Sequence, residues 1–355
     1  MEINKNDVKR YDFLDVAKAI GIYLVIIGHL VMFNWKTFRF IFAFHMPLFF
    51  IIAGFIHGRK DLPGFKSFIK KQIKYYLLPL AVVFIIGIIQ CLIIPLEGHN
   101  IHTLLSKNMI IDLYEGHYRF SFFGSSWFLL CMFWAQLLLY GLLKLREKTK
   151  IYIYILAWII VLALAIFAQD IFFFIPEFHR LPLKLDSALM ATVFMGVGYG
   201  LSEVYHFTRL EDKKWLIRKS IGLILIVIGI PSVYYISCKG NTYVNLCGCV
   251  YARPERYLAG SILGSLMVIG AGIVLEELKV LRFIGRNTLI IFLSHDAVYI
   301  LIIHLINSTF KLKLEALRMD FNWICIVISL ATLLICIGIV FLTNILKKGL
   351  MKKCK

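Results

Sequence analysis

Long apolar runs, separated by short polar and basic segments, follow one another along the whole chain. A helix needs about 20 mostly apolar residues to cross the hydrocarbon core of a bilayer. Only helices satisfy their own backbone hydrogen bonds in lipid at this segment length, so the pattern predicts an all-α integral membrane protein. The ten predicted spans are residues 13–33, 38–57, 77–95, 124–143, 151–168, 187–206, 220–237, 257–275, 287–306 and 322–346.

The polar segments between these runs are too short to fold as domains of their own, the longest being residues 96–123. We therefore expect one polytopic membrane domain over residues 13–346. A short N-terminal tail (1–12) precedes this domain, and a basic C-terminal tail (347–355) follows it.

Composition agrees with a membrane protein and also predicts its orientation. The chain is 60% hydrophobic, with a mean hydropathy of +0.80, whereas soluble proteins are about 45–50% apolar. The net charge of +18 comes from basic clusters between the apolar runs, which indicates topology rather than binding to nucleic acid. With the N-terminus inside, 26 of the 39 Lys and Arg residues fall in inside segments and 12 in or at the edge of outside loops, Arg39 being the one at an edge. Basic residues concentrate on the cytoplasmic side, so we expect both termini in the cytoplasm.

The first span, DFLDVAKAIGIYLVIIGHL, carries three ionisable side chains: Asp15, Lys18 and His29. Lys18 and His29 are eleven residues apart, which is about three helical turns, so they lie on one face, about 16 Å apart along the axis. Asp15 belongs to the same stripe. Asp15 and Lys18 are explained by an ordinary i, i+3 pair near a helix end. His29 lies past the middle of the span, where ionisable groups usually face an interior functional cavity.

Five stretches resemble the membrane acyltransferase 3 family, polytopic bacterial enzymes that O-acylate carbohydrates. The first is LDVAKAIGIYLVIIGH, in which Lys18 and His29 match the family's basic residue, ten residues, then His. In FHMPLFFIIAGF, Ala53 replaces the usual Ser, and in KKQIKYYLLP, Lys71 and Lys74 replace the usual arginines. WFLLCMFW and IGRNTLIIFLSHD are similar to a fucose 4-O-acetylase-like branch.

The resemblance implies an acyltransferase of the bacterial cytoplasmic membrane. It would move an acyl group, in the first instance acetyl, from cytoplasmic acyl-CoA to a sugar hydroxyl of an envelope or exported glycan. His29 is the expected catalytic base, because the pKa of imidazole is close to working pH, or it carries the acyl group itself. Lys18, Lys71 and Lys74 would bind the donor phosphates, and Asp15 would orient or neutralise Lys18. Acetyl-CoA is the expected co-substrate; no bound cofactor and no metal is expected.

Three further side chains are candidates for lining the acceptor cavity. His45 would lie at an outer depth similar to that of His29, and His295 is a second histidine in the middle of a span. Trp127 could stack on a sugar ring or anchor its helix at the interface. The expected partners are the lipid bilayer, acyl-CoA and a carbohydrate acceptor, either a glycan or a lipid-linked sugar, together with glycan-assembly proteins. A transporter or flippase of a glycan precursor is the alternative function.

The outside loops contribute weaker signals. Arg180, Lys184 and Asp186 could contact an acceptor, but we expect them to belong to an ordinary solvated loop. GVGYG, at residues 196–200, is expected to allow close packing of helices rather than to bind a dinucleotide.

Clusters of cysteines and histidines are candidates for a disulfide and for a metal site. Cys238, Cys247 and Cys249 would allow one disulfide in an oxidising space. His99, His102 and His117 share a loop and are not expected to bind metal.

Overall fold

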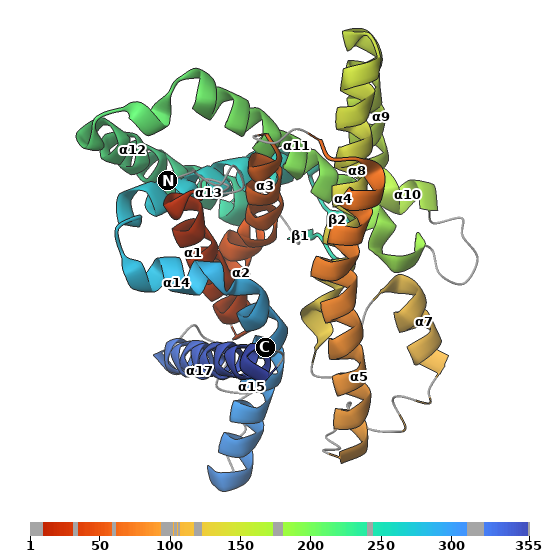
Figure 1. Ribbon diagram of the computed structural model, residues 1–355, viewed down its shortest axis with the longest axis vertical. Helices are drawn as coiled ribbons and strands as arrows, with labels where there is room; N and C mark the ends of the chain where they lie inside the picture. The colour runs from red at the N-terminus through yellow and green to blue at the C-terminus, as the bar shows by residue number, and fades with distance from the viewer. Residues whose placement is uncertain are drawn as a thin grey trace.

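The computed structural model describes residues 10–30, 35–58, 62–93, 102, 105, 107–116, 123–172, 180–239, 244–310 and 323–353. Over this part of the chain it is a bundle of helices with one small β-hairpin (Figure 1). The helices are α1 (Asp12–Leu30), α2 (Trp35–Phe42), α3 (His45–His57), α4 (Phe65–Gln72), α5 (Leu78–Ile93), α7 (Lys107–Glu115), α8 (Trp127–Lys148), α9 (Ile151–Ile166), α10 (Ala168–Phe172), α11 (Leu185–Phe207), α12 (Trp215–Val233), α13 (Pro254–Leu275), α14 (Lys279–Arg286), α15 (Thr288–Phe310) and α17 (Trp323–Lys353).

Short elements join the helices. The strands β1 (Val244–Asn245) and β2 (Val250–Tyr251) pair antiparallel. The 3-10 and π-helical turns are Ile73–Leu77, Gly124–Ser126, Pro182–Lys184, Leu210–Asp212 and Tyr234–Lys239.

The predicted all-α membrane fold is confirmed. Nine helical segments of the described residues are long and apolar enough to cross a bilayer, and each matches a predicted span. The remaining predicted span, 151–168, is the apolar helix α9, which has 16 residues. The second predicted span is interrupted at Ala43–Phe44, where α2 ends and α3 begins. The third begins earlier than expected, because α4, a π-helical turn and α5 form one helical run over Phe65–Ile93.

Helix α1 lies inside the bundle. Its apolar stretch is 72% buried, against 28% for Phe65–Ile93 and 22% for Trp215–Lys239. It contacts α3, α13, α14, α15 and α17, so few of its side chains face lipid. This burial is what allows α1 to carry three ionisable groups.

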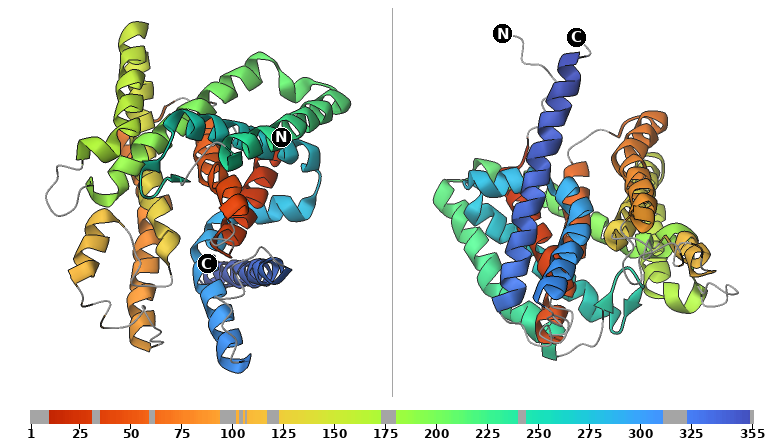
Figure 2. Two further views of the ribbon diagram at one scale, coloured as in Figure 1. Left: turned by 180° about the vertical axis from the view of Figure 1, so that it is seen from behind. Right: turned by 90° about the horizontal axis from the view of Figure 1, so that it is seen from below.

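Hydrogen bonds show how the helices are oriented. Cys325 and Ser329, in the first turns of α17, bond to Leu30 and Tyr23 near the end of α1, so the two helices are antiparallel (Figure 2). The end of α17 therefore lies at the side of the bundle where α1 begins.

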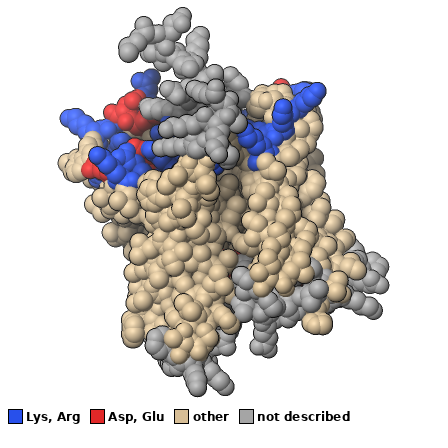
Figure 3. All heavy atoms as spheres, turned by 60° about the horizontal axis from the view of Figure 1, so that its bottom comes forward, with Lys and Arg blue, Asp and Glu red and all other residues tan. Residues whose placement is uncertain are grey.

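Basic side chains gather at that side as well. On the face drawn in Figure 3, Lys and Arg cluster at one end, above a band without charges. Near the start of α1, Tyr11 bonds to His206 at the end of α11, and Arg286 of α14 pairs with Asp12. The distribution is that of a multi-pass membrane protein, and a cytoplasmic location for this side stays a prediction.

Helices α3 and α11 touch through glycines. A Cβ on Gly54 would lie 1.9 Å from the backbone oxygen of Met195, and one on Gly198 would lie 1.9 Å from that of Ile51. The expected close packing at GVGYG is therefore present. It fixes α3, which carries His45 near one end and His57 at the other.

We predict that Gly198→Ala destabilises the protein by an amount near the upper end of about 1–3 kcal/mol, because the added methyl group meets backbone that cannot move aside. Thermal unfolding in detergent measures the effect. Gly200→Ala is the matched control, since a Cβ there has no atom within 4 Å. Equal melting temperatures for the two variants would contradict the described contact between α3 and α11.

Candidate active site

His29 lies in the last turn of α1 and reaches the start of α8. Its Nε2 is 3.1 Å from Oγ of Ser125, which lies in the 3-10 turn before α8. Its ring stacks on Tyr299 of α15, with centroids 5.8 Å apart and an interplanar angle of 17°. The His29 side chain is 29% exposed, so a proton donor can reach it from one side.

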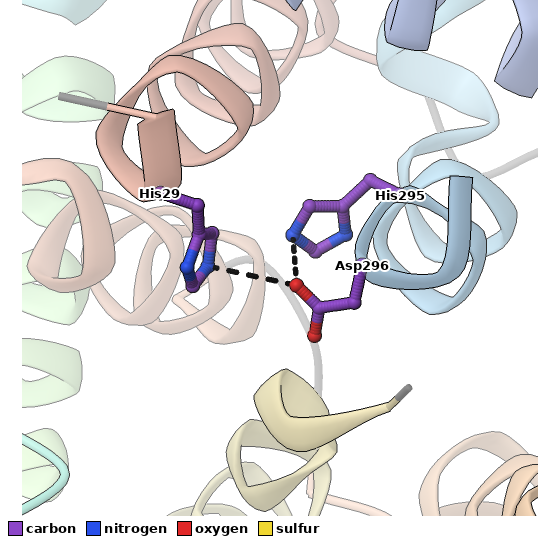
Figure 4. A group of neighbouring side chains, drawn as sticks. All are labelled: His29, His295 and Asp296. Atoms are coloured by element: carbon purple, nitrogen blue, oxygen red, sulfur yellow. Dashed lines mark ion pairs between the residues drawn. The ribbon is translucent and has the colours of Figure 1, made fainter. Parts of the chain in front are cut away.

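Two residues of α15 complete the cluster around His29. Asp296 Oδ1 lies 3.9 Å from His29 Nε2 and 3.3 Å from His295 Nε2 (Figure 4). The other carboxylate oxygen, Oδ2, accepts the backbone N–H of Ser125 at 2.8 Å. His295 Nδ1 faces the backbone oxygen of Phe292 at 2.6 Å. Phe292, His295 and Tyr299 are spaced three and four residues apart, so α15 presents them on one stripe toward α1.

A cavity of about 100 Å³ opens beside His29. Its lining includes His45, Ser125 and Trp127, and three residues of the β1–β2 hairpin, Asn245, Leu246 and Cys247, close one side. The structure therefore brings His29, His45 and Trp127 together. His295 is fully buried and, like Asp296, is not in the lining of this cavity.

The start of α1 is a separate cluster of charges. Asp15 is 2% exposed and pairs with Lys18 at 2.6 Å, with Arg10 at 2.8 Å and with Arg286 at 3.2 Å. Asp15 thus neutralises Lys18 and joins α1 to α14. On Arg286, outside the spans, the bond to Asp15 raises the guanidinium pKa.

A second cavity, of about 210 Å³, lies near the other end of α3. Lys71 is in its lining together with His57, Tyr75 and Gln136, and His57 Nε2 contacts the amide oxygen of Gln136. Lys74 is exposed on the same helical run. Neither Lys18 nor Lys74 is in the lining, so the three predicted donor lysines do not meet in one cavity.

Comparison with known proteins agrees with this architecture. A model of an acyltransferase domain family, membrane acyltransferase 3, matches residues 11–342. The chain belongs to this family. No curated protein and no solved structure gives a significant match. This protein is therefore a membrane acyltransferase, and the matched residues include both cavities.

The expectation of a solvated loop at residues 180–186 of the acyltransferase was wrong. Lys184 is fully buried and Asp186 is 3% exposed, and Arg180 pairs with Asp186 at 2.8 Å. Arg180 and Lys184 both donate to the backbone oxygen of Cys247, at 2.9 and 3.1 Å. These charges are buried because they anchor the hairpin over the cavity.

No disulfide joins Cys238, Cys247 and Cys249, all three of which lie within the described residues. His99 and His117 lie outside the described residues, and His102 is exposed.

Sequence reasoning missed two residues of the acyltransferase site. Ser125 belongs to GSSW, directly before the predicted Trp127, and a polar pair at a helix start was the available signal. Asn245 lies in a short hairpin far along the chain, and no local pattern connects it with His29.

Burial raises the pKa of the Cys249 thiol to about 11. At pH 8 only about one such thiol in a thousand is the reactive thiolate, against about one in four for an unperturbed cysteine. We predict that iodoacetamide alkylates Cys249 on the order of 100-fold more slowly in the folded protein than in the unfolded one. The rate should rise tenfold per pH unit up to about pH 11. Peptide mass spectrometry measures it, and equal rates in both states would show that the hairpin is not docked as described.

Proposed function

We propose that this membrane acyltransferase moves an acyl group, in the first instance acetyl, from cytoplasmic acyl-CoA to a sugar hydroxyl of an envelope or exported glycan. The motifs at residues 127–134 and 284–296 favour the fucose 4-O-acetylase-like branch, in the bacterial cytoplasmic membrane. One observation carries the proposal: a hydroxyl group, that of Ser125, already lies 3.1 Å from His29 Nε2 at the edge of a cavity.

The chemistry needs a base at this place. A sugar hydroxyl bound in the cavity beside the Ser125 hydroxyl would give its proton to His29 Nε2 as its oxygen attacks the thioester carbon. The C–S bond then breaks, and the leaving thiolate takes the proton from His29. In the alternative order, Nε2 attacks the thioester first and the acyl-imidazole passes the group to the sugar. Both orders use the same nitrogen.

The cavity of about 210 Å³ beside Lys71, here called the inner cavity, is the proposed entrance of the donor. Lys71 in its lining and Lys74 beside it would bind the donor phosphates as point charges. Lys18 is paired with Asp15, so we assign it a smaller part in binding the donor phosphates. Helix α3 lines both cavities, through Ala53 in the inner one and Met46 in the outer one. Seven residues of helix span about 10 Å, a distance that an extended pantetheine arm covers.

The cavity of about 100 Å³ beside His29, here called the outer cavity, is the proposed acceptor site. Trp127 offers an apolar ring face to a sugar, and His45 and Asn245 offer polar groups. His45 Nδ1 is 2.9 Å from the backbone oxygen of Ile41, which leaves Nε2 for an acceptor hydroxyl. The proposed partners are therefore acyl-CoA and a glycan or lipid-linked sugar, and no resident cofactor is invoked.

We predict that His29→Ala abolishes esterification of the glycan, because His29 Nε2 is the group that takes the acceptor proton in the proposed reaction. Base-labile esters on envelope glycans are measured by mass spectrometry in cells that lack the gene. These cells are complemented with wild type, His29→Ala or His304→Ala at matched membrane levels. His304 is an exposed histidine of α15 away from the cavity and is the control. We expect esters with wild type and His304→Ala only.

Two outcomes would contradict the proposal. Full ester content with His29→Ala would remove His29 from the reaction. Loss of whole glycan chains from the surface, instead of their esters, would identify the protein as a transporter or flippase of a glycan precursor.

A further inference from the structure

A buried carboxylate lies between two imidazoles next to the proposed acceptor site. Asp296 is 4% exposed and His295 is fully buried. The backbone N–H of Ser125 holds Asp296 Oδ2, and Oδ1 faces Nε2 of both His295 and His29. Within the described residues, neither Asp296 Oδ1 nor His295 Nε2 has a hydrogen-bond partner of normal geometry. These two buried atoms need an explanation.

The two atoms are explained if His295 carries a hydrogen on both of its ring nitrogens. The backbone oxygen of Phe292 can only accept, so the hydrogen of that 2.6 Å contact belongs to His295 Nδ1. A bare Nε2 would then face the Asp296 oxygen at 3.3 Å, which would set two buried acceptors against each other. With a hydrogen on Nε2 as well, His295 is an imidazolium paired with a carboxylate. Such a pair explains how Asp296 keeps its charge within a membrane-spanning helix.

We infer that Asp296 is a positioning residue for His29, and that His295 holds Asp296 in its ionised form. The inference rests on the proposed function. When His29 Nε2 takes the proton of the acceptor, the new N–H needs an acceptor of its own, and Asp296 Oδ1 is 3.9 Å away. A small rotation of either side chain closes that distance. The carboxylate stays ionised, offsets the imidazolium charge, and the proton leaves with the thiolate.

The other groups that face His29 do not supply a negative charge. They are the hydroxyl of Ser125 at the start of α8, the imidazole of His45 on α3, and Tyr299 and His295 on α15. Asp296 is thus the one carboxylate among the described residues at the cluster.

A bound divalent cation would be a different use of the same side chains, since ligand atoms of His29, His295 and Asp296 lie within 4.8 Å of one another. The geometry favours a role of these side chains in proton transfer over the binding of a cation. The hydroxyl of Ser125 already lies on His29 Nε2. The distance of 3.9 Å from His29 to Asp296 also exceeds the spacing of about 3.4 Å between tetrahedral zinc ligands.

Asp296→Asn tests the inference in the purified full-length protein. The amide has the shape of the carboxylate, and its oxygen can still accept the N–H of Ser125. Its NH₂ group can donate to His295 Nε2 once that nitrogen has lost its hydrogen, so the ion pair is replaced by a neutral pair of the same shape. Radiolabelled acetyl-CoA is the donor. The acceptor is the ester-free glycan isolated from the cells that lack the gene. We expect kcat to fall by roughly 10²–10⁴-fold, with KM for both substrates within about threefold of wild type.

Two further variants separate positioning from packing. Asp296→Glu restores the charge and should recover at least about tenfold in kcat over Asp296→Asn. Ser294→Ala, which removes a hydroxyl bonded to the helix's own backbone at Ile290, is the matched control and should keep wild-type kcat. Melting temperatures establish that each variant is folded.

The outcomes are distinct. A kcat for Asp296→Asn within threefold of wild type, or no recovery with Asp296→Glu, would overturn the inference and leave the proposed function standing. Transfer by none of the proteins, wild type included, would overturn the proposed function and the inference with it. One equivalent of a divalent ion in the purified wild type, lost in Asp296→Asn, would show that the cluster is a metal site instead.

Discussion

Lipid does not solvate charge, so every ionisable side chain in a membrane-spanning helix needs a partner within the protein. Helix α1 meets this constraint differently at its two ends. At its start, Asp15 has three cationic neighbours and is held in a fixed network. At its end, His29 keeps one side open to a cavity and has the Asp296 carboxylate 3.9 Å away. The first arrangement joins helices, and the second keeps one side of the His29 ring open to the cavity.

The packing of α3 connects the two ends of the proposed reaction. Gly54 and Gly198 bring its backbone into contact with α11, so α3 has little freedom to shift. The same helix lines the inner cavity near Lys71 and the outer cavity near His29. A rigid wall shared by both cavities keeps the distance between them constant, and a donor arm of fixed length needs such a constant distance.

Hydropathy was enough to predict nine of the ten spans, because burial in lipid acts on each segment separately. Helical periodicity placed Lys18 and His29 on one face, and it also predicted the pair between Asp15 and Lys18, since these relations are local. What could not be predicted depends on contacts between distant segments. The pairing of His29 with Ser125 and Asp296 joins residues 96 and 267 positions apart. Arg180 and Lys184 were expected in solvent because their partner, the hairpin around Cys247, is more than 60 residues away.

The buried cations of that loop show where selectivity for the acceptor can arise. Leu183 and Lys184 adopt left-handed backbone angles, with φ of 55° and 63°, a conformation costly for residues with side chains. The surrounding contacts impose it: Arg180, Lys184 and Ser187 all donate to the backbone oxygen of Cys247. A single carbonyl held by three donors fixes the hairpin, and with it Asn245 at the cavity. His29, Asp296 and Trp127 belong to the helices, whereas Asn245 belongs to a connection that can change without disturbing them. The bundle thus fixes the cluster around His29, and the anchored hairpin fixes one side of the proposed acceptor site.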